Sequence, residues 1–170
     1  MACGLNKQIV LTYGQIKLKQ VNTMSATNGF EDALLDLLFL NTAITNVGDA
    51  TGLTATSTAG SCQVSLHTVA LTDTDTLLTA NECDYTGYTR QTVARSGSGW
   101  TSASGTASNA ALIQFGEKTA GADDTAVHFG LGLIATGDVL RIHGDLTSDL
   151  TISNGVNPQF AIGALDITLD

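Results

Sequence analysis

The sequence is poor in proline, aromatic residues and charge. Its 170 residues include one proline, 5% aromatic and 14% charged residues, whereas glycine occurs 18 times. With so few charges, hydroxyl-bearing and small side chains must cover most of the surface. Such a surface is typical of threonine-rich β-structure and of proteins that pack against copies of themselves. A disordered chain is excluded, because the 43% of apolar residues fall into regular alternations.

Basic residues are scarce, and they are unevenly distributed. Seven Lys and Arg face 16 Asp and Glu, giving a net charge of −9. A nucleic-acid-binding protein would show a basic face, so we expect no nucleic-acid partner. The first 30 residues nevertheless hold Lys7, Lys17 and Lys19 and no acid. This segment therefore differs electrically from the rest of the chain.

The three cysteines, Cys3, Cys62 and Cys83, lack the paired spacing of a zinc site and the even count of a disulfide scaffold. We expect buried or unreactive thiols. No apolar run approaches the roughly 20 residues that span a bilayer, and no signal peptide is recognisable. The sequence therefore predicts a protein made in the cytoplasm, without a membrane partner.

Alternating apolar residues dominate residues 126–170 and predict antiparallel strands. Four apolar runs are separated by glycine-containing turns, one of them at Gly144-Asp145. In the last run, the alternation of apolar residues shifts by one residue at Gly163-Ala164, which predicts a β-bulge. Because the last strand reaches Asp170, we expect removal of a few C-terminal residues to damage the core. The expected strands occupy residues 127–133, 140–142, 150–152 and 160–169.

One amphipathic helix is expected over residues 30–40, with Asn28 as its N-cap. Further short strands are expected before and after it, with exposed loops between them, including an acidic loop at residues 72–86. No βαβ spacing occurs. The predicted fold is therefore mainly β, an antiparallel β-sandwich or jelly roll with one short helix near the N-terminus. We expect two parts, a basic arm (1–28) and a β-sandwich domain (29–170).

No constellation of catalytic residues stands out, so we expect no enzymatic activity and no cofactor. There is no GxSxG motif, phosphate-binding loop or HExxH pattern. His128 and His143 fall on the polar side of their strands and are expected to be exposed. The pairs Asp73/Asp75 and Asp123/Asp124 resemble fragments of calcium loops, which leaves a weak calcium site open. No metal site is predicted.

Several short motifs resemble a family of small virion proteins of tailed bacteriophages. Members are often labelled tail fibre proteins, and some relatives look like capsid cement (decoration) proteins. The resemblance spans about residues 30–170 and implies a β-sandwich virion component, with residues 1–28 added ahead of the usual opening helix. The motifs are Leu66-His67-Thr68, Gly87-Tyr88-Thr89-Arg90, Trp100 with Ser108-Asn109-Ala110, Val127-His128-Phe129-Gly130 and residues 164–170.

Two functions follow from this resemblance. The first is a trimeric capsid cement protein on the capsid exterior, which binds the major capsid protein and stabilises the assembled shell by mass action. The second is a tail fibre or tail-tip component that contacts the host surface through loops such as 72–86. In either case we expect the basic arm and two arginines to contact the partner. The predicted partner-binding residues are Lys7, Ile16, Lys17, Leu18, Lys19, Arg90 and Arg95.

Overall fold

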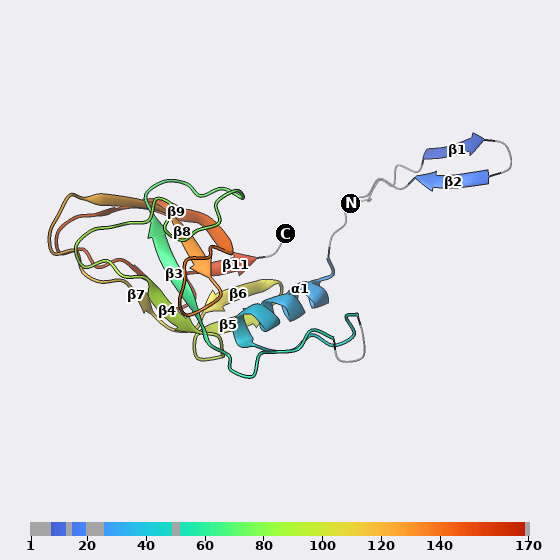
Figure 1. Cartoon of the computed structure of the whole chain (residues 1–170), viewed down its shortest axis with the longest axis horizontal. Coiled ribbons are helices and arrows are strands. Elements are labelled where there is room, and N and C mark those ends of the chain that lie inside the picture. Colours follow the sequence, from blue (N-terminus) through green and yellow to red (C-terminus); the bar gives the residue numbers. More distant parts are fainter. Residues whose placement is uncertain (1–7, 13–14, 20–25, 49–51, 169–170) are drawn as a thin grey trace.

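The computed structural model describes the backbone of residues 8–12, 15–19, 26–48 and 52–168, and side chains from residue 26 onward. Strands predominate, and one short helical segment lies near the N-terminus, so the expected mainly antiparallel β-fold is confirmed (Figure 1). The specific connectivity of a jelly roll stays a prediction, as does the division at residue 28. The elements are β1 (Gln8–Thr12), β2 (Gln15–Lys19), α1 (Asn28–Leu35), η1 (Asp36–Leu40), β3 (Ser61–His67), β4 (Gln91–Ala94), β5 (Trp100–Ala103), β6 (Thr106–Asn109), β7 (Ile113–Gln114), β8 (Asp124–Gly132), β9 (Ile142–Ile152), β10 (Gln159–Phe160) and β11 (Asp166–Thr168).

The helical segment starts at Asn28, the expected N-cap, so the observed N-cap is the residue before it. Thr27 caps α1 through its side chain, which accepts from the Phe30 amide, and a π-helical turn, η1, follows directly. Asn41 then adopts a left-handed conformation with φ of 54° and ends the segment. Asparagine tolerates this conformation better than most residues, which makes it a natural helix stop.

The largest sheet has the order β4-β3-β8-β9 and is antiparallel throughout. Its central pair brings together distant parts of the chain, since Leu66 on β3 lies opposite Phe129 on β8. Smaller sheets, β11-β6-β5 and β10-β7, complete the body (Figure 1). The hairpin of β1 and β2 pairs only with itself among the described strands.

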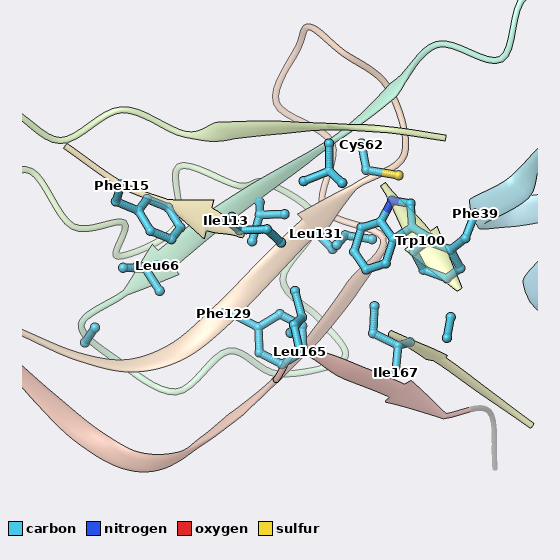
Figure 2. Packing of buried hydrophobic residues seen from close by; sticks show 14 of the residues in the cluster. Phe39, Cys62, Leu66, Trp100, Ile113, Phe115, Phe129, Leu131, Leu165 and Ile167 are labelled. Atoms are coloured by element: carbon cyan, nitrogen blue, oxygen red, sulfur yellow. The ribbon is translucent and has the colours of Figure 1, made fainter. Parts of the chain in front are cut away.

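The core lies between the largest sheet and the smaller ones (Figure 2). Trp100 is fully buried and packs on Phe39 of η1 with ring centroids 4.6 Å apart. Apolar residues of β3 and β8, among them Leu66 and Leu131, supply the other wall. Burial of large apolar side chains of this kind contributes about 1.5–3 kcal/mol each.

Buried Asn109 joins two loops beside the small sheets. Its Nδ2 donates to the carbonyls of Ala111 and Ala161, each at 2.8 Å, and its Oδ1 accepts from the Leu165 amide at 2.9 Å. All three partners are backbone groups, and of these the Ala161 carbonyl also accepts from the Ala164 amide at 3.0 Å. Asn109 therefore fixes the approach to β11 from inside the fold.

The C-terminal strands differ from the expectation in two respects. Gly144-Asp145 is not a turn but lies within β9, which continues unbroken from Ile142 to Ile152. The irregularity lies between β8 and β9, where the register shifts so that His128 faces Asp145 but Ala126 faces Leu150. Gly163, with φ of 69°, lies in the turn between β10 and β11 and is not a bulge. A glycine beside a one-residue shift in the apolar alternation is compatible with a β-bulge or with a turn between two strands. Only the positions of the neighbouring strands distinguish the two.

Candidate functional site

The acidic loop (residues 72–86) has an ordered tip. The Asp75 carboxylate accepts from the Thr72 amide at 2.7 Å and from the Thr72 hydroxyl at 2.9 Å. These hydrogen bonds lower the pKa of Asp75, the backbone one contributing most. Asp73 is fully exposed at the same tip. The tip thus presents negative charge in a locally fixed shape.

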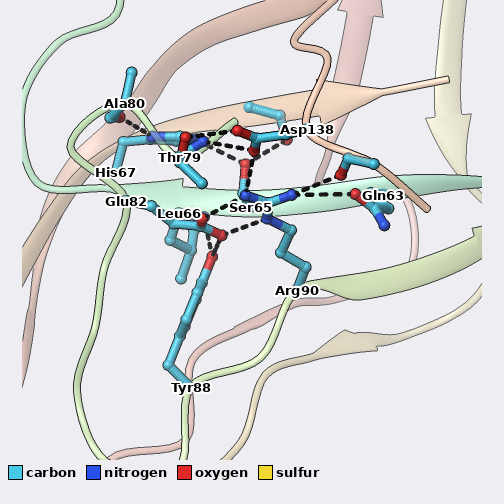
Figure 3. Close-up of polar contacts among 12 residues, drawn as sticks. Gln63, Ser65, Leu66, His67, Thr79, Ala80, Glu82, Tyr88, Arg90 and Asp138 are labelled. Atoms are coloured by element: carbon cyan, nitrogen blue, oxygen red, sulfur yellow. Dashed lines mark hydrogen bonds and ion pairs between the residues drawn. The ribbon is translucent and has the colours of Figure 1, made fainter. Parts of the chain in front are cut away.

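Arg90 anchors this loop to the body through a bidentate ion pair (Figure 3). Its Nε and Nη2 donate to the two carboxylate oxygens of Glu82 at 2.8 and 2.7 Å, and Nη2 also donates to Asp138 at 2.7 Å. The hydrogen bond to Glu82 is the main reason that the pKa of Arg90 is raised. Tyr88 extends the network by donating to Glu82 and accepting from the Leu66 amide.

Asp138 joins a second segment to the acidic loop. It accepts from the Thr79 amide at 3.0 Å and from the Thr79 hydroxyl at 2.6 Å, in addition to Arg90. Burial opposes ionisation of Asp138, but the hydrogen bonds from Thr79 and Arg90 hold its pKa below the ordinary value. The connection between β8 and β9 and the acidic loop are therefore held together by one charged network.

All three histidines of the chain contact this loop or the residues that lead into it. His67 Nδ1 lies 2.8 Å from the Ala80 carbonyl, and His128 Nδ1 accepts from the Leu71 amide at 3.0 Å. His143 Nε2 lies 3.5 Å from Asp73, and His128 Nε2 contacts Asp145. His128 is buried and His143 is half-buried, so the expectation of exposed strand histidines was wrong. The loop covers that face of the sheet, which strand alternation alone does not reveal.

His67 and Ser65 form a buried pair with the geometry of a nucleophile and its base. Ser65 Oγ lies 2.7 Å from His67 Nε2 and 3.2 Å from the Gly130 carbonyl. Both side chains have no solvent exposure. A substrate has no path to a fully buried hydroxyl, so this pair ties β3 to β8 rather than forming an accessible reactive site.

Two further body cations, Arg95 and Lys118, are also bound internally. Arg95 donates to the carbonyls of Leu38, Leu37 and Ala59 at 2.6–2.9 Å, which satisfies the free end of η1. Lys118 is buried and donates to Asp123 at 2.9 Å and to the Gly121 carbonyl at 3.0 Å. Nothing in the sequence pattern distinguished Lys118 from a surface lysine.

The predicted partner-binding residues are not gathered at one place in the described structure. Ile16, Lys17, Leu18 and Lys19 lie on β2, and Lys7 lies outside the described residues. Arg90 and Arg95 are engaged in the contacts above. Their role toward a partner stays a prediction.

The buried thiols are confirmed for the described cysteines. Cys62 and Cys83 are both free and buried. Burial raises the pKa of each thiol to about 12, although Arg95 opposes the shift at Cys62. Both are therefore protonated and unreactive at neutral pH. Cys3 lies outside the described residues.

The candidate metal ligands Asp123 and Asp124 are engaged in hydrogen bonds or ion pairs with other groups of the protein. Asp123 binds Lys118, and Asp124 accepts from the amides of Asp84 and Tyr85. Within the described ranges, no three His, Cys, Asp or Glu residues group as metal ligands. In the same ranges no helix is long and apolar enough to cross a membrane.

Exposed apolar side chains flank the acidic loop. Leu77 and Val139 face one another across an isolated β-bridge and are 49% and 36% exposed, and Ile134, in the same β8–β9 connection as Val139, is 54% exposed. We call these three residues the loop patch. An apolar patch beside charged groups is typical of a contact surface.

A cleft of about 420 Å³ opens elsewhere on the body, along β9. Its apolar lining includes Phe129 and Phe160, and its rim includes Asp145 and Asp166. The register shift of β8 and β9 causes it, since residues 146–149 leave the ladder where the cleft opens.

Comparison with known proteins identifies the family. The model of the family described as Podophage GP4 fiber I protein gp80 matches residues 25–168. A search of the curated proteins found no match. The match runs from just before α1 to the end of β11 and so takes in the whole described body. The chain belongs to the Podophage GP4 fiber I protein gp80 family, a phage fibre family.

Proposed function

We propose that this virion structural protein is a component of a phage fibre and contributes to host attachment through the acidic loop and the loop patch. The family match carries the proposal, because it names a fibre protein and covers the described body. Loops on a rigid scaffold commonly form binding surfaces. The loop is fixed by Arg90 and the histidines and exposes Asp73, so it meets that description.

The role in a capsid cement layer is the second hypothesis. It rests on the resemblance and on the weakly charged surface, whereas the fibre description fits the family name better. Quantitative mass spectrometry of purified virions separates the two. A few copies per particle, with antibody labelling at the tail, supports the fibre role, and hundreds of copies on the shell would refute it. In the cement role, loss of residues 1–28 would weaken binding to shells of the major capsid protein.

The attachment role is tested on intact phage carrying Leu77→Ser together with Val139→Ser. We expect the adsorption rate to host cells to fall about tenfold, because removing each exposed apolar side chain from a binding surface weakens binding by about 0.5–1 kcal/mol. Leu112→Ser is the matched control, since Leu112 is 50% exposed outside the loop patch. Equal adsorption by the double variant and the control would refute a role for the patch.

We also propose that the protein has no enzymatic activity. The supporting observation is the full burial of Ser65 and His67, the described pair with the geometry of a nucleophile and base. Hydrolase activity of the intact chain toward host surface polysaccharide, retained on purification and lost in Ser65→Ala, would contradict this proposal.

A further inference from the structure

The outer edge of β9 is unpaired in the part of the chain that the structure describes. β9 has 11 residues, more than any other described strand, and it stands at the end of the sheet order β4-β3-β8-β9. In the described part of the chain, β8 is the only strand to which β9 pairs. An open edge offers amide and carbonyl groups to an incoming strand.

The cleft beside β9 leaves apolar side chains partly uncovered. Leu146, Leu150 and Phe160 line it and are only half-buried. Its volume of about 420 Å³ is enough for one or two aliphatic side chains. A strand that added to β9 with an apolar face would cover this lining, and the gain follows the apolar area removed from water.

The charge around β9 favours a basic partner. Asp145 is 85% exposed, Asp149 is exposed, and Asp166 lies on the cleft rim. Three of the four body cations, Arg90, Arg95 and Lys118, are occupied by internal contacts. The fourth, Arg141, is exposed and directly precedes β9, so one Arg side chain stands against three acids around this edge.

The β1-β2 hairpin has the complementary composition. Its register places Ile9 opposite Leu18 and Leu11 opposite Ile16, so these four positions share one face. Lys17 and Lys19 occupy the other set of positions on β2, and residues 1–30 contain no acid. An isolated two-stranded hairpin is at best marginally stable in water, so it needs a surface on which to pack.

We propose that the β1-β2 hairpin of one copy adds to β9 of a second copy. The open edge of β2 runs along the outer edge of β9, the apolar positions cover the cleft, and Lys17 and Lys19 lie near Asp145 and Asp149. A second copy is the chosen occupant because, among the described strands, the hairpin pairs only with itself. This inference does not depend on whether the protein is located in a fibre or on the capsid shell of the virion.

The test is reciprocal charge reversal in the full chain, measured by sedimentation equilibrium. Lys17→Glu with Lys19→Glu, and separately Asp149→Lys, are each expected to weaken self-association about three- to tenfold, since each exposed ion pair contributes only modestly to binding. Combining the three substitutions should recover most of the affinity. Glu117→Lys, on an exposed acid that belongs neither to β9 nor to the cleft lining, is the matched control and should change nothing.

Isotope-filtered NMR on a mixture of labelled and unlabelled full chains identifies the occupant. Contacts between β2 of one copy and β9 of another are expected. A chain that stays monomeric at about 100 μM, a concentration sufficient for weak specific contacts, would overturn the proposal. So would contacts found only within one chain, or a charge-reversed arm that associates as tightly as the intact one.

Discussion

Arg90 and Glu82 meet through two parallel hydrogen bonds, Nε to Oε1 at 2.8 Å and Nη2 to Oε2 at 2.7 Å. Both side chains are less than one-fifth exposed. The paired geometry needs a planar guanidinium, which a lysine ammonium does not supply. This pair sets the position of the acidic loop relative to β3 and β4.

Arg90→Lys should lower the free energy of unfolding by about 1–2 kcal/mol, and Arg90→Ala by about 2–4 kcal/mol because it leaves the Glu82 carboxylate partly buried and unpaired. Urea unfolding followed by circular dichroism measures both. Arg141→Lys, on an exposed arginine, should stay within about 0.5 kcal/mol of the parent. Equal effects at positions 90 and 141 would show that the network does not stabilise the fold.

Stability should fall as pH drops through the histidine range. Burial lowers the pKa of His67 from its ordinary value of 6.5, so the unfolded chain takes up a proton at higher pH than the folded one. The stabilisation from the neutral ring is therefore complete above pH 6.5 and is lost as pH falls from there toward the lowered pKa. Asp75 and Asp138 have pKa values below 3.8 and affect only more acidic solutions.

The measurement is urea unfolding between pH 5 and pH 8. The free energy of unfolding of the intact chain should decrease from pH 8 to pH 5. The His67→Gln variant should be less stable than the intact chain at pH 8, but its free energy of unfolding should decrease less between pH 8 and pH 5. An identical pH dependence in the two proteins would exclude His67 as the titrating group.

Asn109→Ala should destabilise the fold by about 2–4 kcal/mol, because it removes three hydrogen bonds to backbone groups and leaves the buried Leu165 amide without its partner. Those groups are the carbonyls of Ala111 and Ala161 and the Leu165 amide. Asn157→Ala, at an exposed position, is the control. Hydrogen exchange at Leu165 should also speed up in Asn109→Ala, and unchanged protection there would contradict the assigned role.

Gly130→Ala should cost about 1–3 kcal/mol through overpacking. A Cβ at this position would lie 2.7 Å from Ser65 Oγ and 3.1 Å from a Leu140 methyl carbon. Gly97→Ala is the matched control, because a Cβ there meets nothing within 4 Å and its φ is not positive. Thermal unfolding should separate the two variants by several degrees.

The fold class could be predicted from the local sequence pattern, whereas the exposure of individual side chains and their polar partners could not. Apolar alternation indicated β3 and β8, and the run at 30–40 indicated the helical segment, because both signals are carried by neighbouring residues. The burial of His128 depends on a loop that starts about 57 residues away and offers the Leu71 amide. The roles of Arg90 and Arg95 likewise depend on the Asp138 carboxylate and the Leu38 carbonyl, which lie 48 and 57 residues away in the sequence.

The pairing of β3 with β8 has a kinetic consequence. Ser65 and Gly130, which face one another, are separated by 65 residues, whereas Ala103 and Thr106 at the β5-β6 turn are near neighbours. The β5-β6 hairpin is therefore able to form within microseconds, but the central sheet must wait for a long loop to close. We expect refolding on the millisecond-to-second scale of β-rich domains, with β3 and the apolar part of β8 exposed to other chains in the meantime.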